Sequence, residues 1–542
     1  MVLAIALIVA AGGAVVAFRP GPIGRLLHHV TTIASAGGLA GTQPHRGGTL
    51  TIALPVTGSL DPAFAVQIGE RTLAASLFSG LTRLDQNGTV QPAVAASWSS
   101  DPTLRHWRFQ LRPGARFSNG APIQAADVKF AWERLASPKL QPRPSPLAYL
   151  LATVEGYQAF SSGHARGISG IATPDAATLQ VDLSQPFADF PALVASPSLA
   201  PLPQTVVAKD PAGFASAPVG EGPFQLSHPY RKGQPIDLLR NPAAVGLTAY
   251  LDRVRVVTVP DEQTAWLDFQ NNRVQAAPVP TDQLTAAKTV EGSGLVQAPT
   301  ATTWSLAFNL RVKPFTDPRW RRAVALAINR QRLAAAFAGA RTVAPGIVPD
   351  GVPGATHAAC PACTSNPAQA RSLLAQLHPA ATPVTVTLTI PATGPDERIA
   401  KLLVADLQAV GITLKVNPVD PAAYLFVLTS KQPSIQLFTL GWTGDPPLMD
   451  TFLFDQFSTH GASNLTGFTN PPTDALLTQA RSTPDSATRT RLYQQAETAI
   501  LAQTPTLPLL ESRATLAFTH GIQGLTITPT ATLPLATTSL AT

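Results

Sequence analysis

The stretch Thr382–Val419, "TPVTVTLTIPATGPDERIAKLLVADLQAVGITLKVNPV", determines the fold class of this chain. Its first part alternates threonine with hydrophobic residues, a pattern typical of a strand: Val384, Val386, Leu388 and Ile390. The middle part carries hydrophobic residues at helical spacing before Gly411: Ile399, Leu402, Leu403, Leu407 and Val410. "ITLKVNPV" then returns as a strand. Because a strand, a helix and a strand with short connections form a parallel βαβ unit, we predict an α/β fold.

Three further segments carry clear periodic patterns. Residues 315–339, "FTDPRWRRAVALAINRQRLAAAFAG", predict one helix with Asp317 as its N-cap, Pro318 at its first position and Gly339 at its end. We expect that helix to expose its arginines and to bury one stripe: Trp320, Val324, Ala327 and Ile328. In the first half, "GGTLTIALP" (47–55) predicts a strand and "AADVKFAWERLAS" (125–137) predicts a helix.

The length and charge of the chain limit its architecture and its partners. At 542 residues it is longer than the size at which one hydrophobic core stops growing, so we expect at least two lobes. Its net charge of +7 is scattered, without the concentrated basic stripe that nucleic-acid binding favours. We therefore predict no nucleic-acid partner.

The first residues are apolar and uncharged. Val2–Phe18, "VLAIALIVAAGGAVVAF", is near the lower length limit for a helix that spans a bilayer. A secretory signal would carry positive charge before the apolar run, whereas only Met1 precedes it here. We predict a membrane anchor or signal segment at 1–18 and a linker at 19–46.

Two cysteines, Cys360 and Cys363, form a CxxC pair in "HAACPACTSN". Such a pair can be half of a zinc site, a redox pair or a short disulfide, and the disulfide is the simplest outcome if the chain is exported. The sequence contains no GxSxG, no GxxxxGK followed by Ser or Thr, and no HExxH. We therefore predict no catalytic residues, no metal site and no cofactor.

One acid stands out in "FTLGWTGDPPLMDTFLF", Phe438–Phe454. Asp445 is either a turn acid beside Pro446 and Pro447 that faces water or an anion held for a cationic ligand. The next acid, Asp450, is expected to cap the helix that follows.

Several segments, in order along the chain, are similar to those of a single family. The strongest is His106–Pro138, "HWRFQLRPGARFSNGAPIQAADVKFAWERLASP", which follows Leu77–Trp98, "LFSGLTRLDQNGTVQPAVAASW". The others are short: "SLDPAF", "VGEGPFQL", "NLRVKPFTDPRWRRAVALAINR" and "GWTGD". Together they resemble the extracytoplasmic solute-binding proteins of peptide-type ABC importers, over residues 47 to about 512.

The resemblance implies a two-lobed fold of the periplasmic-binding type II, with a ligand cleft between lobes that close by a hinge. Lobe one would comprise 47–258 together with 504–542, and lobe two 259–503. The protein would be an extracytoplasmic monomer that captures a short peptide or similar solute and delivers it to ABC permease subunits. The alternatives are a non-peptide solute, such as a nickel complex or an oligosaccharide, and an enzyme built on the same scaffold.

The resemblance also implies a ligand site. The match to the family's acid falls on Asp445, which would receive the ligand's α-ammonium. Leu440, Gly441 and Trp442 would form a strand edge for the ligand's main chain, with Trp442 as a wall or, alternatively, as a core residue. From the other lobe, the matching segment is Val66, Gln67 and Ile68.

Overall fold

The computed structural model describes residues 44–56, 58–290, 292–357, 360–378, 384–430 and 435–541. The expected anchor or signal at 1–18 lies outside the described residues, as does all of the expected linker except 44–46. Within the described ranges, no helix is long and apolar enough to cross a membrane.

The strands are β1 (Thr49–Pro55), β2 (Thr82–Leu84), β3 (Val90–Pro92), β4 (Ala95–Ser100), β5 (His106–Leu111), β6 (Ile171–Asp175), β7 (Thr178–Asp182), β8 (Phe224–Leu226), β9 (Ile236–Arg240), β10 (Arg253–Val259), β11 (Ala276–Pro278), β12 (Ser293–Phe308), β13 (Arg341–Val343), β14 (Val384–Pro391), β15 (Ile412–Val419), β16 (Leu437–Thr443), β17 (Thr506–Thr519), β18 (Ile522–Gln523) and β19 (Ser539–Leu540).

The α-helices are α1 (Ile68–Leu77), α2 (Ala125–Ala136), α3 (Tyr157–Ser161), α4 (Phe190–Leu193), α5 (Gln204–Lys209), α6 (Pro211–Phe214), α7 (Glu262–Gln270), α8 (Leu284–Ala287), α9 (Pro318–Ala327), α10 (Arg330–Ala335), α11 (Pro367–Leu377), α12 (Gly394–Gln408), α13 (Tyr424–Thr429), α14 (Met449–Phe457), α15 (Pro471–Arg481) and α16 (Ser486–Gln503). The 3₁₀ turns are η1 (Pro62–Phe64), η2 (Ala148–Leu151), η3 (Pro197–Leu199), η4 (Thr281–Gln283) and η5 (Leu535–Thr537).

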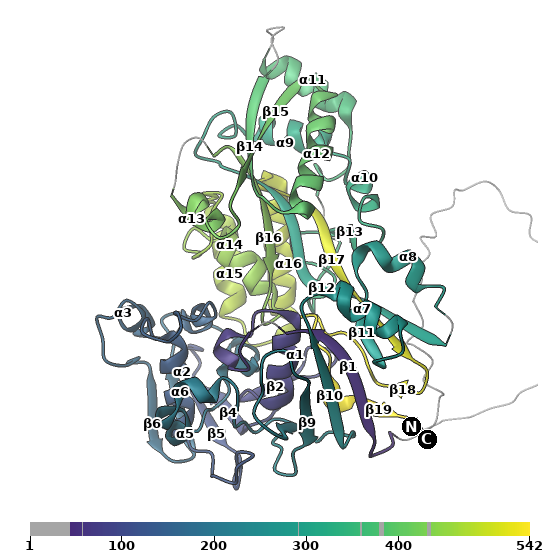
Figure 1. Ribbon diagram of the computed structural model, residues 1–542. Coiled ribbons are helices and arrows are strands. Elements are labelled where there is room, and N and C mark those ends of the chain that lie inside the picture. The colour runs from purple at the N-terminus through teal and green to yellow at the C-terminus, as the bar shows by residue number, and fades with distance from the viewer. Residues whose placement is uncertain are drawn as a thin grey trace, which may run out of the picture. The chain divides into compact units, whose positions relative to one another are not determined.

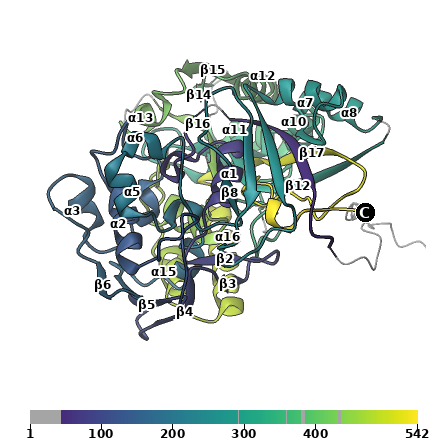
Figure 2. The ribbon, with the colours of Figure 1, turned by 60° about the horizontal axis from the view of Figure 1, so that its bottom comes forward.

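Most long strands join one 11-stranded sheet (Figure 1). Its order is β15-β14-β16-β12-β17-β11-β1-β10-β9-β8, and β13 also pairs with β17. The two longest strands, β12 and β17, lie antiparallel from the pair Ser293–Thr519 to the pair Ala307–Thr506 (Figure 2). They therefore connect the strands around β14 with the strands around β1. A separate four-stranded sheet has the order β4-β5-β7-β6.

The βαβ unit predicted from the opening stretch is present. β14 and β15 pair in parallel from Val384–Ile412 to Pro391–Val419, and α12 connects them. Figure 1 shows α12 beside these two strands. The buried residues of α12 include Ile399, Leu403 and Leu407, as its periodicity indicates. The α/β prediction is confirmed, as are the predicted strand β1 and helix α2.

The prediction of a single helix over 315–339 is wrong, because the chain forms two helices there, α9 and α10. The side chain of Asp317 accepts from the backbone N–H of Arg319 (2.9 Å) and caps α9, with Pro318 at the first position. A second cap interrupts the helix: Asn329 accepts from the N–H of Arg332 (3.0 Å) and starts α10. Since Asn favours caps over helix interiors, its side chain sets this break.

The arginines of α9 do not all face solvent, which corrects a second expectation. Arg321 is buried, and its guanidinium donates to the carbonyl oxygens of Phe315, Gln503 and Thr504 at 2.7–3.3 Å. These carbonyls lie at a helix C-terminus and a loop, where orphan acceptors attract a cation. Of the expected stripe, Val324, Ala327 and Ile328 are buried and Trp320 is half-buried.

Separate hydrophobic cores lie at the two ends of β17. Leu516 and Phe518 belong to a core with β1, β10, α1 and α2, whereas Leu507–Leu510 belong mainly to one with α9, α12, β14 and β15. Helices α14, α15 and α16 enclose a third core. Residues 259–287 pack against Ala53 and Ala517. The division of the chain into lobe one (47–258 together with 504–542) and lobe two (259–503) stays a prediction.

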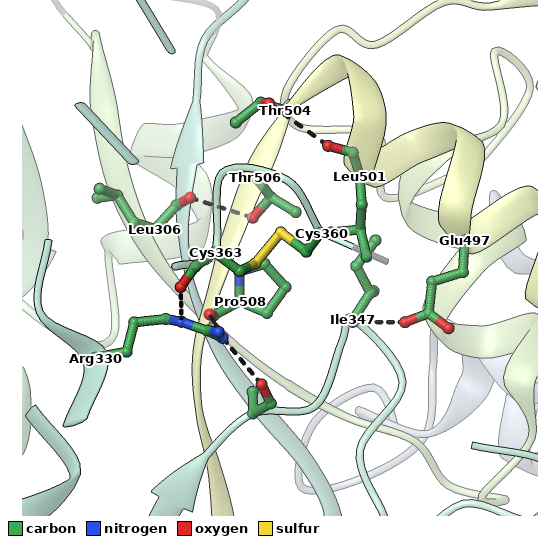
Figure 3. The surroundings of a disulfide bond; sticks show 11 residues. Leu306, Arg330, Ile347, Cys360, Cys363, Glu497, Leu501, Thr504, Thr506 and Pro508 are labelled. Atoms are coloured by element: carbon green, nitrogen blue, oxygen red, sulfur yellow. Dashed lines mark hydrogen bonds between the residues drawn. A yellow bond between two sulfur atoms is a disulfide. The ribbon is translucent and has the colours of Figure 1, made fainter. Parts of the chain in front are cut away.

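Cys360 and Cys363 are joined by a disulfide in the structure (Figure 3). Arg330 ties the bridged loop to the sheet, because its Nε donates to the carbonyl of Cys363 and its Nη1 to the carbonyls of Ala344 and Pro508, each at 3.0 Å. Arg330 therefore holds the bridged loop beside α10 and β17.

Candidate functional site

Two neighbouring hollows share two lining residues, Arg71 of α1 and Thr530. The larger has a volume of about 360 Å³. It is lined by residues of β1, α1, α7, β11, η4, α8, β12, β13, β16 and β17 and by the C-terminal segment 527–533. The smaller, about 70 Å³, is lined by α1, η3 and the side chains of Asp445, Thr530 and Thr532. The larger volume lies within the usual range for small-molecule sites.

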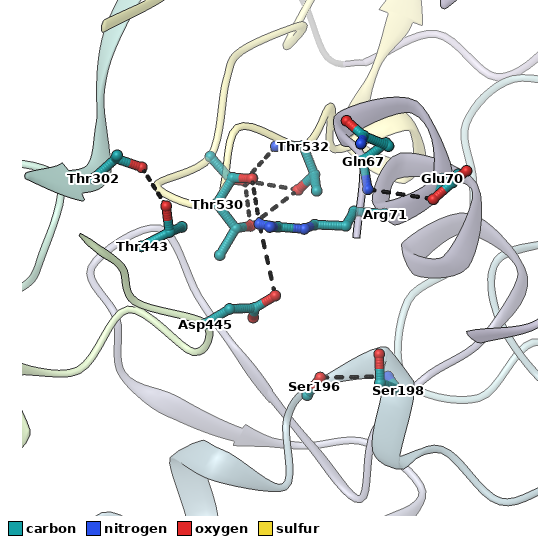
Figure 4. Close-up of polar contacts among 11 residues, drawn as sticks. Gln67, Glu70, Arg71, Ser196, Ser198, Thr302, Thr443, Asp445, Thr530 and Thr532 are labelled. Carbon is teal, nitrogen blue, oxygen red and sulfur yellow. Dashed lines mark hydrogen bonds and ion pairs between the residues drawn. The ribbon is translucent and has the colours of Figure 1, made fainter. Parts of the chain in front are cut away.

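Asp445 lies just after β16 and faces Arg71 across the smaller hollow (Figure 4). Its Oδ2 is 3.7 Å from Arg71 Nη1, and the two side chains are 22% and 21% exposed. Arg71 Nη1 also donates to the carbonyl of Thr530 at 3.4 Å. Arg71 Nε is buried and makes no hydrogen bond with any residue that the structure describes. The pair is thus a loose contact in which neither group is fully satisfied.

The electrostatics of Asp445 reflect this incomplete pairing. Burial raises the pKa of Asp445 above its ordinary value, and the charge of Arg71 lowers it only in part. A carboxylate whose desolvation is not offset by its partner gains from any further cation that comes within hydrogen-bond distance. The smaller hollow is therefore a site that favours positive charge beside Asp445.

Strand β16 has an open edge next to Asp445. On one side it pairs with β12 along its whole length, from Leu437–Phe308 to Thr443–Thr302. On the other side it pairs with β14 only at Leu437 and Phe438. From Leu440 to Thr443, that second edge has no strand partner within the described residues, and Gly441 and Thr443 are exposed. An extended chain can therefore add to this edge by main-chain hydrogen bonds.

Leu440 and Trp442 line neither hollow. Trp442 is half-buried and packs against the core of α14, α15 and α16, which agrees with the core alternative for this residue. Its indole Nε1 is buried without a hydrogen-bond partner among the described residues. Gly441 is opposite Trp304 on β12, and a Cβ there would lie 3.2 Å from the Trp304 ring. Gly441 therefore leaves room for that indole.

The segment Val66–Ile68 starts helix α1. Ile68 is 40% exposed and lines the larger hollow, whereas Val66 packs against the core and Gln67, although exposed, lines neither hollow. The backbone N–H of Gln67 donates to Glu70 Oε2 (3.3 Å), which caps the helix and fixes where it begins. Ile68 and Arg71 are three residues apart and so share one face of α1.

Sequence reasoning missed Arg71, Thr530 and Tyr149. Tyr149 is 50% exposed, and burial raises its pKa to about 12, with the negative charge of Asp445 as the next cause. The pattern Gln67-x-x-Glu70 indicates that a helix starts at Ile68. In such a helix Arg71 would lie on the same face as Ile68, so this pattern could have predicted its position. No local pattern marks Thr530, which reaches Arg71 from 459 residues away.

Asp450 does not cap α14, which corrects the expectation for this acid. The N-cap is Leu448, and the Asp450 carboxylate instead binds Arg481 (2.9 and 3.1 Å) and the hydroxyl of Tyr493 (2.8 Å). Asp450 lines neither hollow. Among the described residues, no group of three or more His, Cys, Asp or Glu side chains could hold a metal ion.

Comparisons with known proteins identify the family of this chain. Residues 89–464 match the family described as bacterial extracellular solute-binding proteins, family 5 Middle. The probable deoxycholate-binding periplasmic protein YgiS of Escherichia coli (strain K12) is 28% identical over 83% of this chain and 85% of its own. The dipeptide-binding protein DppE of Bacillus subtilis (strain 168) is 27% identical over 80% of this chain and 81% of its own.

A solved structure of the periplasmic murein tripeptide binding protein MppA, in an unliganded open form, has the same fold. Its TM-score is 0.79 at 24% identity, over 92% of this chain and 99% of that one. The two-lobed type II fold expected from the sequence is thereby confirmed. The chain belongs to family 5 of the bacterial extracellular solute-binding proteins and is the extracytoplasmic substrate-binding component of a peptide-type ABC importer, not an enzyme.

Proposed function

We propose that this protein captures a short peptide through its free α-ammonium, which Asp445 receives, and delivers the peptide to its permease. The observation that carries the proposal is the loose pair of Asp445 and Arg71 at the open edge of β16. A fully paired acid would have nothing to offer a ligand, whereas Asp445 keeps an unsatisfied carboxylate beside a hollow.

The ligand's ammonium would replace Arg71 as the closest cation to Asp445. An ammonium brings three N–H donors, and at hydrogen-bond distance these would form shorter contacts than the present 3.7 Å. The ligand's main chain would then continue along Leu440–Thr443, whose edge is open. Main-chain pairing does not read side chains, so several peptides can bind in this way.

Ile68 and Tyr149 would contact the peptide's side chains. Both are large, exposed hydrophobic residues, Ile68 lining the larger hollow and Tyr149 lying within the electrostatic reach of Asp445. Val66, Gln67, Leu440 and Trp442 would act indirectly, by holding α1 and β16 in place. Gly441 would offer only its backbone.

Short peptides are favoured over other solutes. Two of the curated relatives are named for a dipeptide and for deoxycholate. Deoxycholate is a carboxylate without an ammonium, so it would leave the charge of Asp445 without a cation other than Arg71. The geometry of Asp445 therefore favours the peptide.

Binding isotherms measured by calorimetry test this proposal with Ala-Ala, N-acetyl-Ala-Ala and deoxycholate. We expect Ala-Ala to bind and to raise the melting temperature, and the acetylated peptide to bind at least thirtyfold more weakly. Asp445→Asn should weaken Ala-Ala by about the same factor, while Asp420→Asn, an exposed acid outside both hollows, should change nothing.

Two outcomes would overturn the proposal. One is equal binding of the free and the acetylated peptide by the unsubstituted protein. The other is binding of deoxycholate alone, without any response to Ala-Ala.

We also propose that residues 1–18 tether the protein to the outer side of the cytoplasmic membrane. The support is the uncharged apolar run Val2–Phe18. Deleting 2–18 behind a cleavable export signal should release the protein from the membrane fraction, and membrane retention of that variant would contradict the tether.

A further inference from the structure

Arg71 has more hydrogen-bond donors than the protein satisfies. Among the described residues, its guanidinium makes one hydrogen bond, from Nη1 to the carbonyl oxygen of Thr530 at 3.4 Å, and one ion pair, the 3.7 Å contact with Asp445 (Figure 4). Its Nε is buried without a partner. A guanidinium carries five N–H donors in a rigid plane. Most donors of Arg71 are therefore left for water or for a group from outside the protein.

An unpartnered Nε does not by itself indicate a binding site. Arg83 of β2 also has a buried Nε without a hydrogen-bond partner in the part of the chain that the structure describes, yet it lines neither hollow. Arg71 differs in position, because it lines both hollows. A ligand that enters either hollow can therefore reach its free donors.

The smaller hollow is polar and has little room. Two charged side chains line it, those of Asp445 and Arg71. Its hydroxyl groups come from Ser196, Ser198, Thr530 and Thr532. The volume of about 70 Å³ has room for roughly five to seven water-sized groups, at about 10–15 Å³ each. The ammonium, α-carbon and carboxylate of an amino acid are together of this size.

The charges of the two side chains match those of such a head group. Asp445 Oδ2 and Arg71 Nη1 are 3.7 Å apart, which is longer than the roughly 2.7–2.9 Å of a charge-assisted hydrogen bond. An ammonium can therefore approach Asp445 while a carboxylate on the same carbon approaches Arg71. Each protein charge would exchange one loose contact for hydrogen bonds to the ligand.

The orientation of Arg71 is supported from its own helix. The carbonyl of Thr530, which accepts from Arg71, belongs to the turn 528–532, and a backbone hydrogen bond of 2.9 Å closes that turn. The next residue, Leu533, donates its N–H to Thr72 Oγ1 at 3.3 Å, which ties the turn to α1. Arg71 and its acceptor are thus fixed to the same helix, which lowers the conformational entropy lost on binding.

We propose that the smaller hollow binds a complete α-amino-acid head group, with the α-ammonium at Asp445 and the α-carboxylate at Arg71. The inference rests on the proposed function, in which Asp445 receives the ligand's ammonium. In an ordinary peptide the first α-carboxyl group is part of the peptide bond, so only a neutral carbonyl oxygen would face Arg71. A peptide joined through a side chain, such as a γ-glutamyl peptide, keeps both charges on its first α-carbon.

The ligand class is therefore short peptides linked through the side chain of their first residue. The head group would lie in the smaller hollow, and the remainder would pass into the larger hollow, because Arg71 and Thr530 line both. A charged acceptor makes stronger hydrogen bonds with a guanidinium than a neutral carbonyl does. The site would accordingly prefer γ-glutamyl peptides over the isomeric α-linked peptides.

Calorimetry with matched peptides tests this inference. γ-Glu-Ala and its α-amide differ only in the carboxylate that Arg71 would bind, whereas γ-Glu-Ala and α-Glu-Ala are isomers with the same charged groups. The unsubstituted protein should bind γ-Glu-Ala roughly tenfold or more better than either comparison peptide. Equal binding of γ-Glu-Ala and either comparison peptide would overturn the inference.

Substitutions of Arg71 show whether this side chain causes the preference. Arg71→Gln should remove it, so that γ-Glu-Ala and its α-amide bind about equally. Arg71→Lys keeps the charge without the planar donor set and should keep part of the preference, so this variant serves if Arg71→Gln does not fold. Arg83→Gln is the matched control, because Arg83 has a similar unpartnered Nε outside both hollows, and it should leave the preference unchanged.

Ala-Ala separates failure of this inference from failure of the proposed function. If Ala-Ala binds but γ-Glu-Ala has no advantage over its α-amide, only this inference fails. If Arg71→Gln weakens both γ-linked peptides by the same factor, Arg71 has a structural role and the inference is again wrong. If the unsubstituted protein binds neither Ala-Ala nor either γ-linked peptide, the proposed function and this inference fail together.

Discussion

Two acid–arginine pairs, Asp445 with Arg71 and Asp450 with Arg481, involve acids only five residues apart, yet their geometries differ. Arg481 Nε lies 2.9 Å from Asp450 Oδ1 and Nη2 lies 3.1 Å from Oδ2, and the side chains are 6% and 3% exposed. Tyr493 adds a third hydrogen bond to Asp450. Asp445 and Arg71 are 3.7 Å apart, about one fifth exposed, and leave Arg71 Nε unpartnered among the described residues.

The difference separates structure from function. Asp450 and Arg481 satisfy each other in a dry environment among α14, α15 and α16, so that pair holds three helices together. Asp445 and Arg71 come from distant segments, meet at a hollow and remain incompletely paired. The same residue types thus stabilise the fold in one place and stay available to a ligand in the other.

Breaking the buried pair should have the largest effect on stability. Arg481→Met leaves the Asp450 carboxylate buried without its cation, and we expect a loss of about 3–5 kcal/mol in the free energy of unfolding. Urea unfolding measures it. Arg319→Met, in the exposed pair with Asp317, is the control and should cost no more than about 1 kcal/mol. A loss below about 1 kcal/mol for Arg481→Met would remove the contrast between the two pairs.

The pH dependence of stability should come from the buried cluster around Asp450. Burial and the charge of Asp450 raise the pKa of Asp455 to about 7, although Arg481 lowers it. Since the folded pKa lies above the unfolded one, near 3.9, the folded state binds the extra proton between these values. The contribution of Asp455 to the free energy of unfolding should therefore be largest below about pH 4. It should fall as the pH rises through 7.

Asp455→Asn isolates that contribution. The slope of stability against pH between about 4 and 7 should become shallower by on the order of 1 kcal/mol per pH unit. Glu497, whose pKa burial also raises to about 7, should keep part of the slope in this variant. An unchanged slope would show that Asp455 titrates normally.

The loose pair should contribute least to stability. Arg71→Met and Asp445→Asn should each change the free energy of unfolding by no more than about 1 kcal/mol, and a double-mutant cycle should give a coupling of similar size. Ligand affinity should respond differently: it should fall as the pH drops through the raised pKa of Asp445, because the protonated acid no longer attracts an ammonium. A coupling of 3 kcal/mol or more would make this pair structural as well.

The sequence predicted the local elements better than the places where they meet. The alternation in Val384–Ile390 and the helical spacing up to Val410 depend on neighbouring residues, and they predicted the parallel pair of β14 and β15 correctly. The break at Asn329 went unpredicted because hydrophobic spacing continues through it, and only the Asn side chain marks the second cap.

The candidate site was predicted only in part. Asp445 and Ile68 could be selected from motifs. Asp445 lines the smaller hollow and Ile68 lines the larger one. Arg71 and Thr530 meet only in the folded chain. Such partners are chosen by tertiary packing, for which a single sequence carries no periodic signal. The burial of Arg321 was missed for the same reason, since its carbonyl partners include Gln503 and Thr504 of a distant helix end.

A crystal structure of the protein with a bound dipeptide would show directly which group Asp445 pairs with. We predict the peptide nitrogen at about 2.7–3.2 Å from an Asp445 carboxylate oxygen, with the peptide main chain along Leu440–Thr443. A peptide whose ammonium lies elsewhere, with Asp445 still paired only to Arg71, would contradict it.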